Sequence, residues 1–311
     1  MKIKRKFVTK KIFNLISEKS TFQKKKINFF HNKLKDKDFN EIEVYLKLYK
    51  NFLIKNKLSL EIAVKSYYEM CTDMFNCHIK FLRTGKYPVK SLAEAKKNVY
   101  FNSVKMKSYM VGLAISQFFW ETHYKMFKHL QKMILSKSNA RSYLEIGPGH
   151  GLFSHYSLNE LKVLTDYTAV DISKTSLKLT RDFLYYNSKK NLKKKTNFIN
   201  IDFLESKDLT KKFELVVCGE VIEHVSNPIK LLKNIKKSLD KNGKVFISTC
   251  VNCPAIDHVN EFLSIDQIEN LFKKAKLRVI SKKVLPVERV TYKVALKKKI
   301  TINYSAILKH I

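Results

Sequence analysis

Three of the seven glycines in this 311-residue chain fall within a window of five residues. They are Gly147, Gly149 and Gly151, in the stretch LEIGPGHG that begins at Leu144. Glycine allows tight turns and a close approach of the backbone to a ligand, because it has no side chain. A chain that is otherwise poor in glycine is therefore expected to have a binding loop here, and its fold must present that loop.

From Ser142 onward, short apolar segments alternate with helical ones, which is the pattern of an α/β protein. The predicted strands are RSYLEIG, YTAVDIS (167–173), NFINID (197–202), FELVVCGE (213–220) and GKVFISTC (243–250), followed by the closing segments LRVISKKVLP and KKITINYSAILKHI. This order predicts a doubly wound, mostly parallel sheet of seven strands. Ligands of such sheets bind beyond the carboxyl ends of the strands, so the glycine window after the first strand is predicted to be the binding loop.

The first 135 residues have a different pattern, with apolar residues at helical spacing. Long helices are expected over residues 38–55, 60–82 and 110–135, with a break at the TGKYP stretch. We therefore predict two parts, an all-helical N-terminal region of residues 1–135 and an α/β domain of residues 136–311. The N-terminal helices are expected to cover the site, and the aromatic cluster FFWETHYKMF before the first strand is expected to be core.

The spacing of the three glycines argues against a dinucleotide cofactor. Nicotinamide and flavin dinucleotides are bound by the pattern G-x-G-x-x-G, whereas this chain has G-x-G-x-G, with the third glycine one residue early. The acidic residue Glu145 just before the window is also unusual for that fingerprint. A nicotinamide-dependent oxidoreductase is therefore the less favoured interpretation.

The same stretch resembles motif I of the class I S-adenosylmethionine-dependent methyltransferases, in which an acidic residue and one apolar residue precede G-x-G-x-G. The resemblance covers about residues 140–311. It implies a Rossmann-like methyltransferase fold and S-adenosyl-L-methionine as the cofactor. It also implies that the cofactor is bound at Glu145, Gly147, Gly149 and Gly151.

Further segments follow in the order that this family has them. The resemblance implies that Asp171, at the end of the second strand, accepts the ribose hydroxyls, with Ile172 beside it. It implies that Asp202 accepts the adenine amino group and that Phe203 packs on the ring. Each acid also has a structural interpretation, as part of a helix cap for Asp171 and as the ion-pair partner of a lysine for Asp202.

The segment VVCGEVIEHVSNP after the fourth strand resembles the corresponding segment of quinone-biosynthesis and related small-molecule methyltransferases. This resemblance implies that backbone carbonyls near Cys218 hold the ammonium group of the cofactor and that Glu220 belongs to the cofactor site. His224, in the Glu-His-Val triplet, is a candidate substrate residue. The alternative for His224 is a structural role in the first turn of a helix.

The candidate catalytic residues come from the loop TCVNCPAIDHVNEF after the fifth strand, because this loop leaves the sheet on the cofactor side. Related methyltransferases often have a similar Asn-x-Pro-x-x-Asp-His stretch. We predict His258 as the general base for a hydroxyl acceptor, with Asp257 orienting it or binding the acceptor. The alternative is that His258 only shapes the site. Asn252 and, from the N-terminal helices, Tyr109 and His123 are predicted to reach the acceptor.

These features predict an enzyme that methylates a small-molecule or sugar/lipid-precursor acceptor, with O-methylation favoured. The alternative is an RNA or other nucleic-acid methyltransferase. Against that alternative, the fourth strand ends in CGEV and not in the Asn/Asp-Pro-Pro-aromatic motif that is typical of base-amino methylation. A non-catalytic cofactor-binding protein is a further alternative, and the sequence does not identify the acceptor.

The net charge of +34 is compatible with contact to nucleic acid, to an anionic substrate or to a membrane surface. Only six of the 61 basic residues are arginine, the side chain that contacts phosphate and guanine bidentately, so a solvated lysine-rich surface is the favoured interpretation. No apolar run approaches the ~18 residues of a transmembrane helix, and the N-terminus lacks the apolar region of a signal peptide. A cytoplasmic protein is therefore expected, with peripheral membrane contact and the oligomeric state left open.

The chain has five cysteines, an odd number that does not indicate a disulfide framework. Cys250 and Cys253 form a C-x-x-C pair. A zinc site would need a second ligand pair, and none stands at a convincing spacing. We therefore predict two incidental thiols and no metal site.

Overall fold

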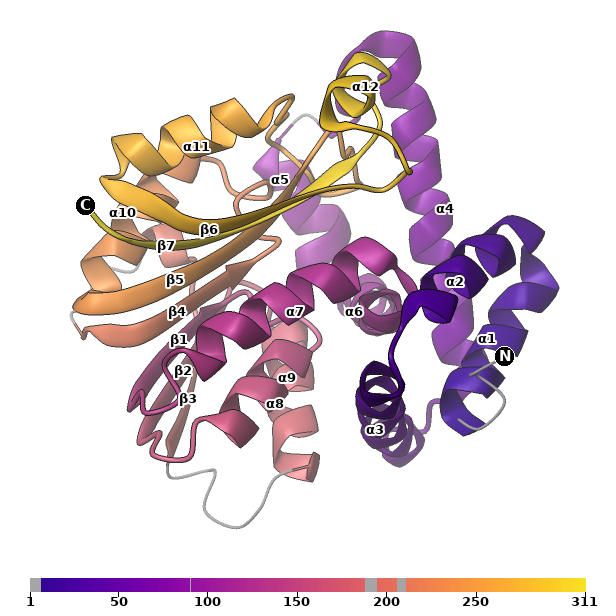
Figure 1. Cartoon of the computed structure of the whole chain (residues 1–311), viewed down its shortest axis with the longest axis horizontal. Coiled ribbons are helices and arrows are strands. Elements are labelled where there is room, and N and C mark those ends of the chain that lie inside the picture. The colour runs from indigo at the N-terminus through magenta and orange to yellow at the C-terminus, as the bar shows by residue number, and fades with distance from the viewer. Residues whose placement is uncertain (1–6, 90, 188–194, 206–210) are drawn as a thin grey trace.

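The computed structural model describes residues 7–89, 91–187, 195–205 and 211–311. It contains the predicted seven-stranded sheet, with the strand order β3-β2-β1-β4-β5-β7-β6 (Figure 1). The strands are β1 (Ser142–Ile146), β2 (Asp166–Asp171), β3 (Thr196–Asn200), β4 (Phe213–Gly219), β5 (Leu239–Val251), β6 (Leu277–Pro286) and β7 (Ile302–His310). Strands β1 to β5 are parallel, and β7 runs antiparallel to both β5 and β6. The predicted fold class is confirmed.

Helices cover both faces of the sheet, which explains why its central strands are apolar without alternation. One face packs against α7 (Glu121–Leu135), α8 (Leu152–Glu160) and α9 (Lys174–Asn187), and the other against α10 (Pro228–Ser238) and α11 (Ile265–Lys274) (Figure 1). The neighbouring β1 residues Tyr143 and Leu144 are both fully buried, but they belong to the apolar clusters of opposite faces.

The N-terminal region is helical, as predicted. Its helices are α1 (Phe7–Lys19), α2 (Thr21–Lys33), α3 (Asp36–Lys55), α4 (Leu60–Thr84), α5 (Leu92–Ala95), the π-helix η2 (Lys96–Tyr100) and α6 (Ser103–Phe119). The side chains of Ser20, Ser59 and Asn102 cap α2, α4 and α6 by accepting backbone N–H groups. Gly85 ends α4 in the left-handed conformation, inside the predicted TGKYP break.

Helix α7 belongs to the predicted N-terminal region by sequence, yet it packs directly on the sheet. The two ring nitrogens of His129 in α7 lie 2.8 Å from the Ser305 hydroxyl of β7 and 2.9 Å from the Ser281 hydroxyl of β6. The N-terminal helices and this face of the sheet also share one continuous apolar cluster. The division of the chain at residue 135 therefore stays a prediction, and α7 is one of the layers of the sheet domain.

The expectation of one long helix over residues 110–135 is wrong, because the helix breaks at Trp120. The backbone of Trp120 is extended, with φ −107° and ψ 123°, and separates α6 from α7. Its indole N–H donates to the hydroxyl of Tyr67 in α4 over 2.7 Å, which holds the break in place. Phe118 and Phe127 on either side are fully buried, so the aromatic cluster is core as predicted.

Two short helices complete the described part of the chain, the 3-10 helix η4 (Phe203–Glu205) after β3 and α12 (Tyr292–Lys297) between β6 and β7. Among the described residues, no helix combines the length and apolar character needed to cross a bilayer.

Candidate functional site

A cavity of about 1010 Å³ lies at the carboxyl ends of β1, β2 and β4, where the sheet meets the N-terminal helices. Its walls include the glycine loop after β1, residues of α2 and α6, and the loop after β5. Thirteen predicted site residues line it: Tyr109, His123, Glu145, Gly147, Gly149, Asp171, Ile172, Asp202, Phe203, Glu220, His224, Asp257 and His258. The fold therefore brings residues from seven separated segments to one place.

The glycine loop forms a cradle in the cavity wall that only glycine permits. Gly147 and Gly149 have φ values of +66° and +59°, a region that favours glycine. A Cβ atom on Gly147 would come within 2.5 Å of Cγ2 of Val221. Both residues line the cavity, so the backbone is open to a ligand there.

Three predicted site residues do not line the cavity, and each has another structural place. Gly151 begins α8 with φ +77°, and a Cβ there would approach the Thr180 backbone of α9. The Cys218 side chain is fully buried in the apolar cluster on the α10 and α11 face. Asn252 has φ +51°, and its main chain is tied to Phe262 and to the hydroxyl of Thr301. The prediction that Asn252 reaches the acceptor is therefore not supported by its position.

The carboxylate of Glu145 is held by hydroxyl groups of the protein. Its Oε2 atom accepts from Tyr143 over 2.6 Å, from Ser154 over 2.7 Å and from Tyr167 over 3.4 Å. Burial raises the pKa of Glu145 to about 7. These bonds fix the carboxylate behind the glycine loop, so Glu145 supports the loop that forms the cradle.

Asp171 ends β2 at the cavity wall. Its Oδ1 atom accepts the backbone N–H of Ser173 over 2.8 Å, and its Oδ2 atom accepts the Ser176 hydroxyl over 2.7 Å. Burial raises the pKa of Asp171 to about 6. Each carboxylate oxygen can accept more than one hydrogen bond, so Asp171 caps α9 and still has acceptor capacity for a pair of ligand hydroxyls.

Asp202 and Phe203 form the wall after β3. The Oδ1 atom of Asp202 accepts the N–H of Leu204 over 3.0 Å, and its Oδ2 atom lies 3.3 Å from Nζ of Lys96. The ion pair that the sequence analysis gave as the structural interpretation is therefore present. Because Lys96 belongs to η2, it links the N-terminal region to the predicted adenine end of the cavity.

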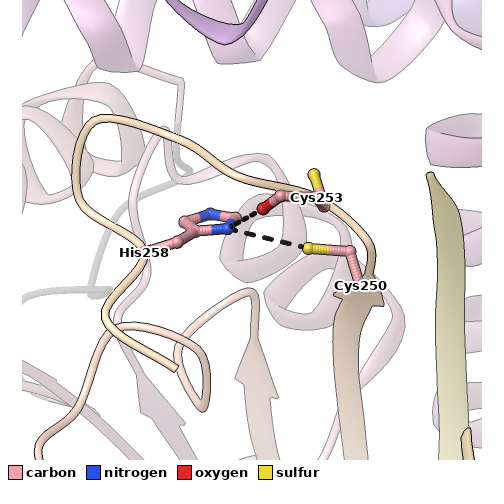
Figure 2. A group of neighbouring side chains, drawn as sticks. All are labelled: Cys250, Cys253 and His258. Carbon is pink, nitrogen blue, oxygen red and sulfur yellow. Dashed lines mark hydrogen bonds between the residues drawn. The ribbon is translucent and has the colours of Figure 1, made fainter. Parts of the chain in front are cut away.

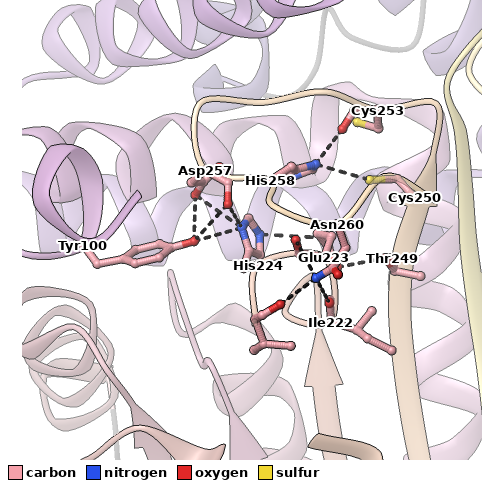
Figure 3. Close-up of polar contacts among 11 residues, drawn as sticks. Tyr100, Ile222, Glu223, His224, Thr249, Cys250, Cys253, Asp257, His258 and Asn260 are labelled. Atoms are coloured by element: carbon pink, nitrogen blue, oxygen red, sulfur yellow. Dashed lines mark hydrogen bonds and ion pairs between the residues drawn. The ribbon is translucent and has the colours of Figure 1, made fainter. Parts of the chain in front are cut away.

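Where η2, the segment after β4 and the loop after β5 meet, five side chains form what we call the polar corner: Tyr100, Glu223, His224, Asp257 and His258 (Figure 3). The Nδ1 atom of His224 lies 2.9 Å from the Tyr100 hydroxyl and 3.1 Å from the Asp257 backbone carbonyl. The Tyr100 hydroxyl also contacts Oδ2 of Asp257 over 3.3 Å. Burial raises the pKa of the Asp257 carboxyl, and among the described residues its Oδ1 atom has no hydrogen-bond partner.

The imidazole of His258 is oriented by a backbone carbonyl, and among the described residues no hydrogen bond joins it to Asp257, whose predicted role in binding the acceptor stays a prediction. Its Nδ1 atom lies 2.5 Å from the carbonyl oxygen of Cys253 (Figure 2). A carbonyl only accepts, so Nδ1 carries the proton and Nε2 has the lone pair. Burial holds the pKa of His258 well below its usual value, which keeps the ring neutral.

Tyr109 and His123 reach the cavity from either side of the Trp120 break. The Nδ1 atom of His123 lies 3.0 Å from the hydroxyl of Ser116, and burial lowers the pKa of His123 to about 3. A histidine that stays neutral can offer a hydrogen bond to a ligand but brings no charge into the cavity.

Tyr100 and Lys96 are not among the predicted site residues, although Tyr100 contacts His224 and Lys96 contacts Asp202. Both lie in η2, a segment that carried no motif. The only signal was the Ser91 cap, whose side chain accepts the N–H of Glu94 and places a helical segment after the TGKYP break.

A family model described as a methyltransferase domain matches residues 119–282. The matched range includes the glycine loop and the residues of the polar corner from Glu223 to His258. It begins at the end of α6, before the predicted domain boundary.

Curated relatives are similar to part of the chain. The tRNA U34 carboxymethyltransferase of Campylobacter jejuni is 27% identical over 162 residues, which are 50% of this chain and 53% of the relative. The ubiquinone biosynthesis O-methyltransferase of Glaesserella parasuis is 30% identical over 119 residues, 35% of this chain and 45% of the relative. The chain spans about half the length of the curated relatives it matches.

Among solved structures, the mitomycin 7-O-methyltransferase MmcR matches with a TM-score of 0.52 and 12% identity, covering 81% of this chain and 70% of that one. At this identity the similarity concerns the fold alone.

Proposed function

The chain belongs to the class I S-adenosylmethionine-dependent methyltransferases, and from this premise we propose that it methylates an oxygen atom of a small-molecule or sugar/lipid-precursor acceptor. We propose that the cofactor binds in the part of the cavity formed by the glycine loop, Asp171 and Phe203. Gly147 and Gly149 offer the open backbone that a bulky cofactor needs. Asp171 has acceptor capacity for the ribose hydroxyls, and Phe203 lines the wall where the adenine is expected.

The observation that carries the proposal is that the cradle and the polar corner are parts of one cavity. Ligand pockets commonly enclose about 300–1,000 Å³, so a cavity of about 1010 Å³ has room for a cofactor and an acceptor together. The cavity lining also includes apolar side chains, among them Phe30, Phe119 and Trp120. A small acceptor with apolar surface and one reactive polar group fits such a space.

When bound, S-adenosylmethionine supplies a methyl group that is already activated for transfer. The protein then has to hold the acceptor in line, keep water out and stabilise its deprotonated form. We assign the first two tasks to the N-terminal helices and the third to the polar corner, where His258 and Asp257 contact the acceptor oxygen. His258 suits this position because its Nε2 lone pair is left free by the bond from Nδ1 to Cys253.

An RNA acceptor is the second candidate. Two observations favour it: a curated relative is named for tRNA, and the net charge is +34. Lys25, Lys26 and Lys33 of α2 also stand at the wall of the cavity. Against it, Lys26 pairs with Glu288 over 2.5 Å, from α2 to the segment after β6, which narrows the access for a nucleic acid.

The test measures which acceptor receives a labelled methyl group. The full chain is incubated with methyl-labelled S-adenosylmethionine and, separately, with a small-molecule extract and with total RNA, and Asp171→Ala is the matched control. Label in an extracted compound, present with wild type and absent with the variant, supports the proposal, and mass spectrometry shows whether oxygen carries it. Label in RNA alone would transfer the assignment to the second candidate.

A further inference from the structure

Two imidazoles and the Glu223 carboxylate of the polar corner lie beside a further carboxylate, that of Glu220. Glu223, His224 and His258 each offer one ligand atom, and these atoms all lie within 4.8 Å of one another (Figure 3). Glu220 is adjacent, because ligand atoms of Glu220, Glu223 and Cys250 also lie within 4.8 Å of one another. Glu220, His224 and His258 line the cavity, so the group is open toward a substrate.

Both histidines are held in the way that metal-binding histidines usually are. The Nδ1 atom of His258 donates to the carbonyl of Cys253 over 2.5 Å. The Nδ1 atom of His224 lies 3.1 Å from the carbonyl of Asp257 and 2.9 Å from the Tyr100 hydroxyl, which can accept from Nδ1 while it donates to Asp257. Where a carbonyl accepts a hydrogen bond from Nδ1, that nitrogen carries the proton and the lone pair is on Nε2. Ligating histidines almost always donate their second ring N–H to a carbonyl or carboxylate, which fixes the tautomer and the ring orientation.

The two carboxylates have oxygen atoms that the protein leaves without a partner. Oε2 of Glu223 accepts the Thr249 hydroxyl over 2.8 Å, but its Oε1 atom is buried with no hydrogen-bond donor among the described residues and lies 4.0 Å from Nε2 of His224. Oε1 of Glu220 is also buried with no hydrogen-bond donor among the described residues, and this side chain contacts the Glu223 carboxyl. Buried acceptors without a donor are rare, and a bound ion is one of their standard explanations.

We propose that Glu223, His224 and His258 bind a divalent first-row transition ion such as Zn²⁺ or Mn²⁺, with Glu220 beside it and an open position toward the cavity. Imidazole nitrogens with a carboxylate favour these ions over Mg²⁺ and Ca²⁺, which prefer oxygen ligands alone. The open position distinguishes a catalytic site from a closed structural one.

The role of the ion rests on the proposed function. In the open position it binds the acceptor oxygen and lowers the pKa of that hydroxyl. The O–H bond then breaks, the proton leaves to water and the oxygen keeps the electron pair. His258 acts as a ligand in this account, so the ion replaces an unassisted imidazole base.

Cys250, Cys253 and His258 form a second possible ligand set around the same histidine (Figure 2). In that set, the atom of His258 next to Sγ of Cys250, at 3.9 Å, is Nδ1. This nitrogen already carries a proton, which it donates in the hydrogen bond to the Cys253 carbonyl. The thiol set would therefore require His258 to give up its orienting bond, which is why the nitrogen and oxygen set is favoured.

The test measures metal binding on the full chain. The protein is dialysed against a chelator, and Zn²⁺, Mn²⁺ and Mg²⁺ are titrated into it by calorimetry. We expect about one equivalent of Zn²⁺ or Mn²⁺, weaker binding of Mg²⁺, and a loss of at least about tenfold in affinity in Glu223→Gln. His78→Gln, a half-buried histidine of α4 outside the cavity, is the matched control and should bind as wild type does. A wild type that binds neither ion overturns the proposal.

The Co²⁺ spectrum of the wild type tests the ligand set even if Glu223→Gln does not fold. Nitrogen and oxygen ligation gives ligand-field bands without a thiolate charge-transfer band. A thiolate band, or loss of the ion in Cys250→Ser with full binding in Glu223→Gln, would assign the ion to the thiols and overturn the proposal.

Binding of S-adenosylhomocysteine is measured on the same samples to separate the two proposals. Metal loss with intact nucleoside binding in Glu223→Gln supports a metal site on the acceptor side. A wild type that binds the ion but not S-adenosylhomocysteine would refute the proposed function while the metal site stands.

Discussion

The Nδ1 atom of His258 lies 2.5 Å from the carbonyl oxygen of Cys253, and this contact decides which ring nitrogen is available to a ligand. With the proton on Nδ1, the lone pair on Nε2 is free for a proton or a metal ion. The buried ring stays neutral, which suits metal ligation and makes Nε2 a weak proton acceptor. The orienting group belongs to the loop after β5 itself, so His258 does not depend on its sequence neighbour Asp257.

Replacing His258 by glutamine should remove turnover and leave cofactor binding in place. The residue contacts the acceptor end of the cavity, and loss of a proton-transfer or metal-ligand group typically lowers rates by about 10²-fold or more. The measurement is the initial rate of methyl transfer, together with the affinity for S-adenosylhomocysteine. His78→Gln is the control. A variant that keeps the wild-type rate would leave His258 with only a packing role.

Gly147→Ala and Gly85→Ala form a matched pair that separates backbone strain from crowding. Both glycines have positive φ, +66° and +73°. A Cβ on Gly85 meets only Nζ of Lys299 at 3.9 Å, whereas a Cβ on Gly147 meets Val221 at 2.5 Å. We expect Gly85→Ala to cost about 1 kcal/mol of unfolding free energy and Gly147→Ala to cost about 1–3 kcal/mol more, by denaturant titration. Equal losses would show that Val221 moves away freely.

His31 should make the protein less stable in acid. It is fully buried among aromatic rings, and burial lowers its pKa from 6.5 to about 4. The unfolded chain therefore binds this proton first, so the contribution of His31 is fully present above pH 6.5 and is lost as the pH falls toward 4.

The test compares the unfolding free energy of wild type and His31→Gln at pH 7.5 and near pH 4.5. Glutamine does not titrate but can still donate to the Phe118 carbonyl, which His31 contacts through Nε2. We expect wild type to lose on the order of 1–3 kcal/mol more than the variant over this range. The same loss in both proteins would mean that His31 is not responsible.

The sheet was predictable because its signals are local. Each parallel strand is a short apolar run, and the glycine window lies directly after the first of them, so the fold class and the place of the binding loop follow from the sequence pattern. The break at Trp120 was not predictable, because the apolar spacing continues through it. It depends on the contact between its indole and Tyr67, which is distant in sequence.

The candidate site was predictable where a motif follows a strand and not where side chains meet in space. Asp171 and His258 come from such motifs and line the cavity. Asn252 comes from one too, but it does not line the cavity, and its backbone is left-handed. Tyr100 and the carbonyl of Cys253 carry no sequence signal, since a tyrosine or a backbone carbonyl is identified as a partner only when the fold places it.

The absence of a second Cys or His pair near Cys250 and Cys253 led to the prediction of no metal site. That prediction depended on the spacing of the residues along the chain alone. The fold places His258 beside the two cysteines and also beside Glu223 and His224. Ligand sets assembled from the segment after β4 and the loop after β5 have no fixed spacing along the chain, so they are identified only in the structure.

The central claim, a cofactor site between the glycine loop and Asp171, is tested most directly by calorimetric binding of S-adenosylhomocysteine to wild type, Asp171→Ala and Asp182→Ala, with NADH as a comparison ligand. Asp182 lies in α9, the helix that Asp171 caps, but it pairs with Lys178 at the surface. The account predicts binding to wild type and Asp182→Ala, a loss of about tenfold or more in Asp171→Ala, and no heat from NADH. Equal affinity in all three proteins, or binding of NADH in place of the sulfur ligand, would contradict it.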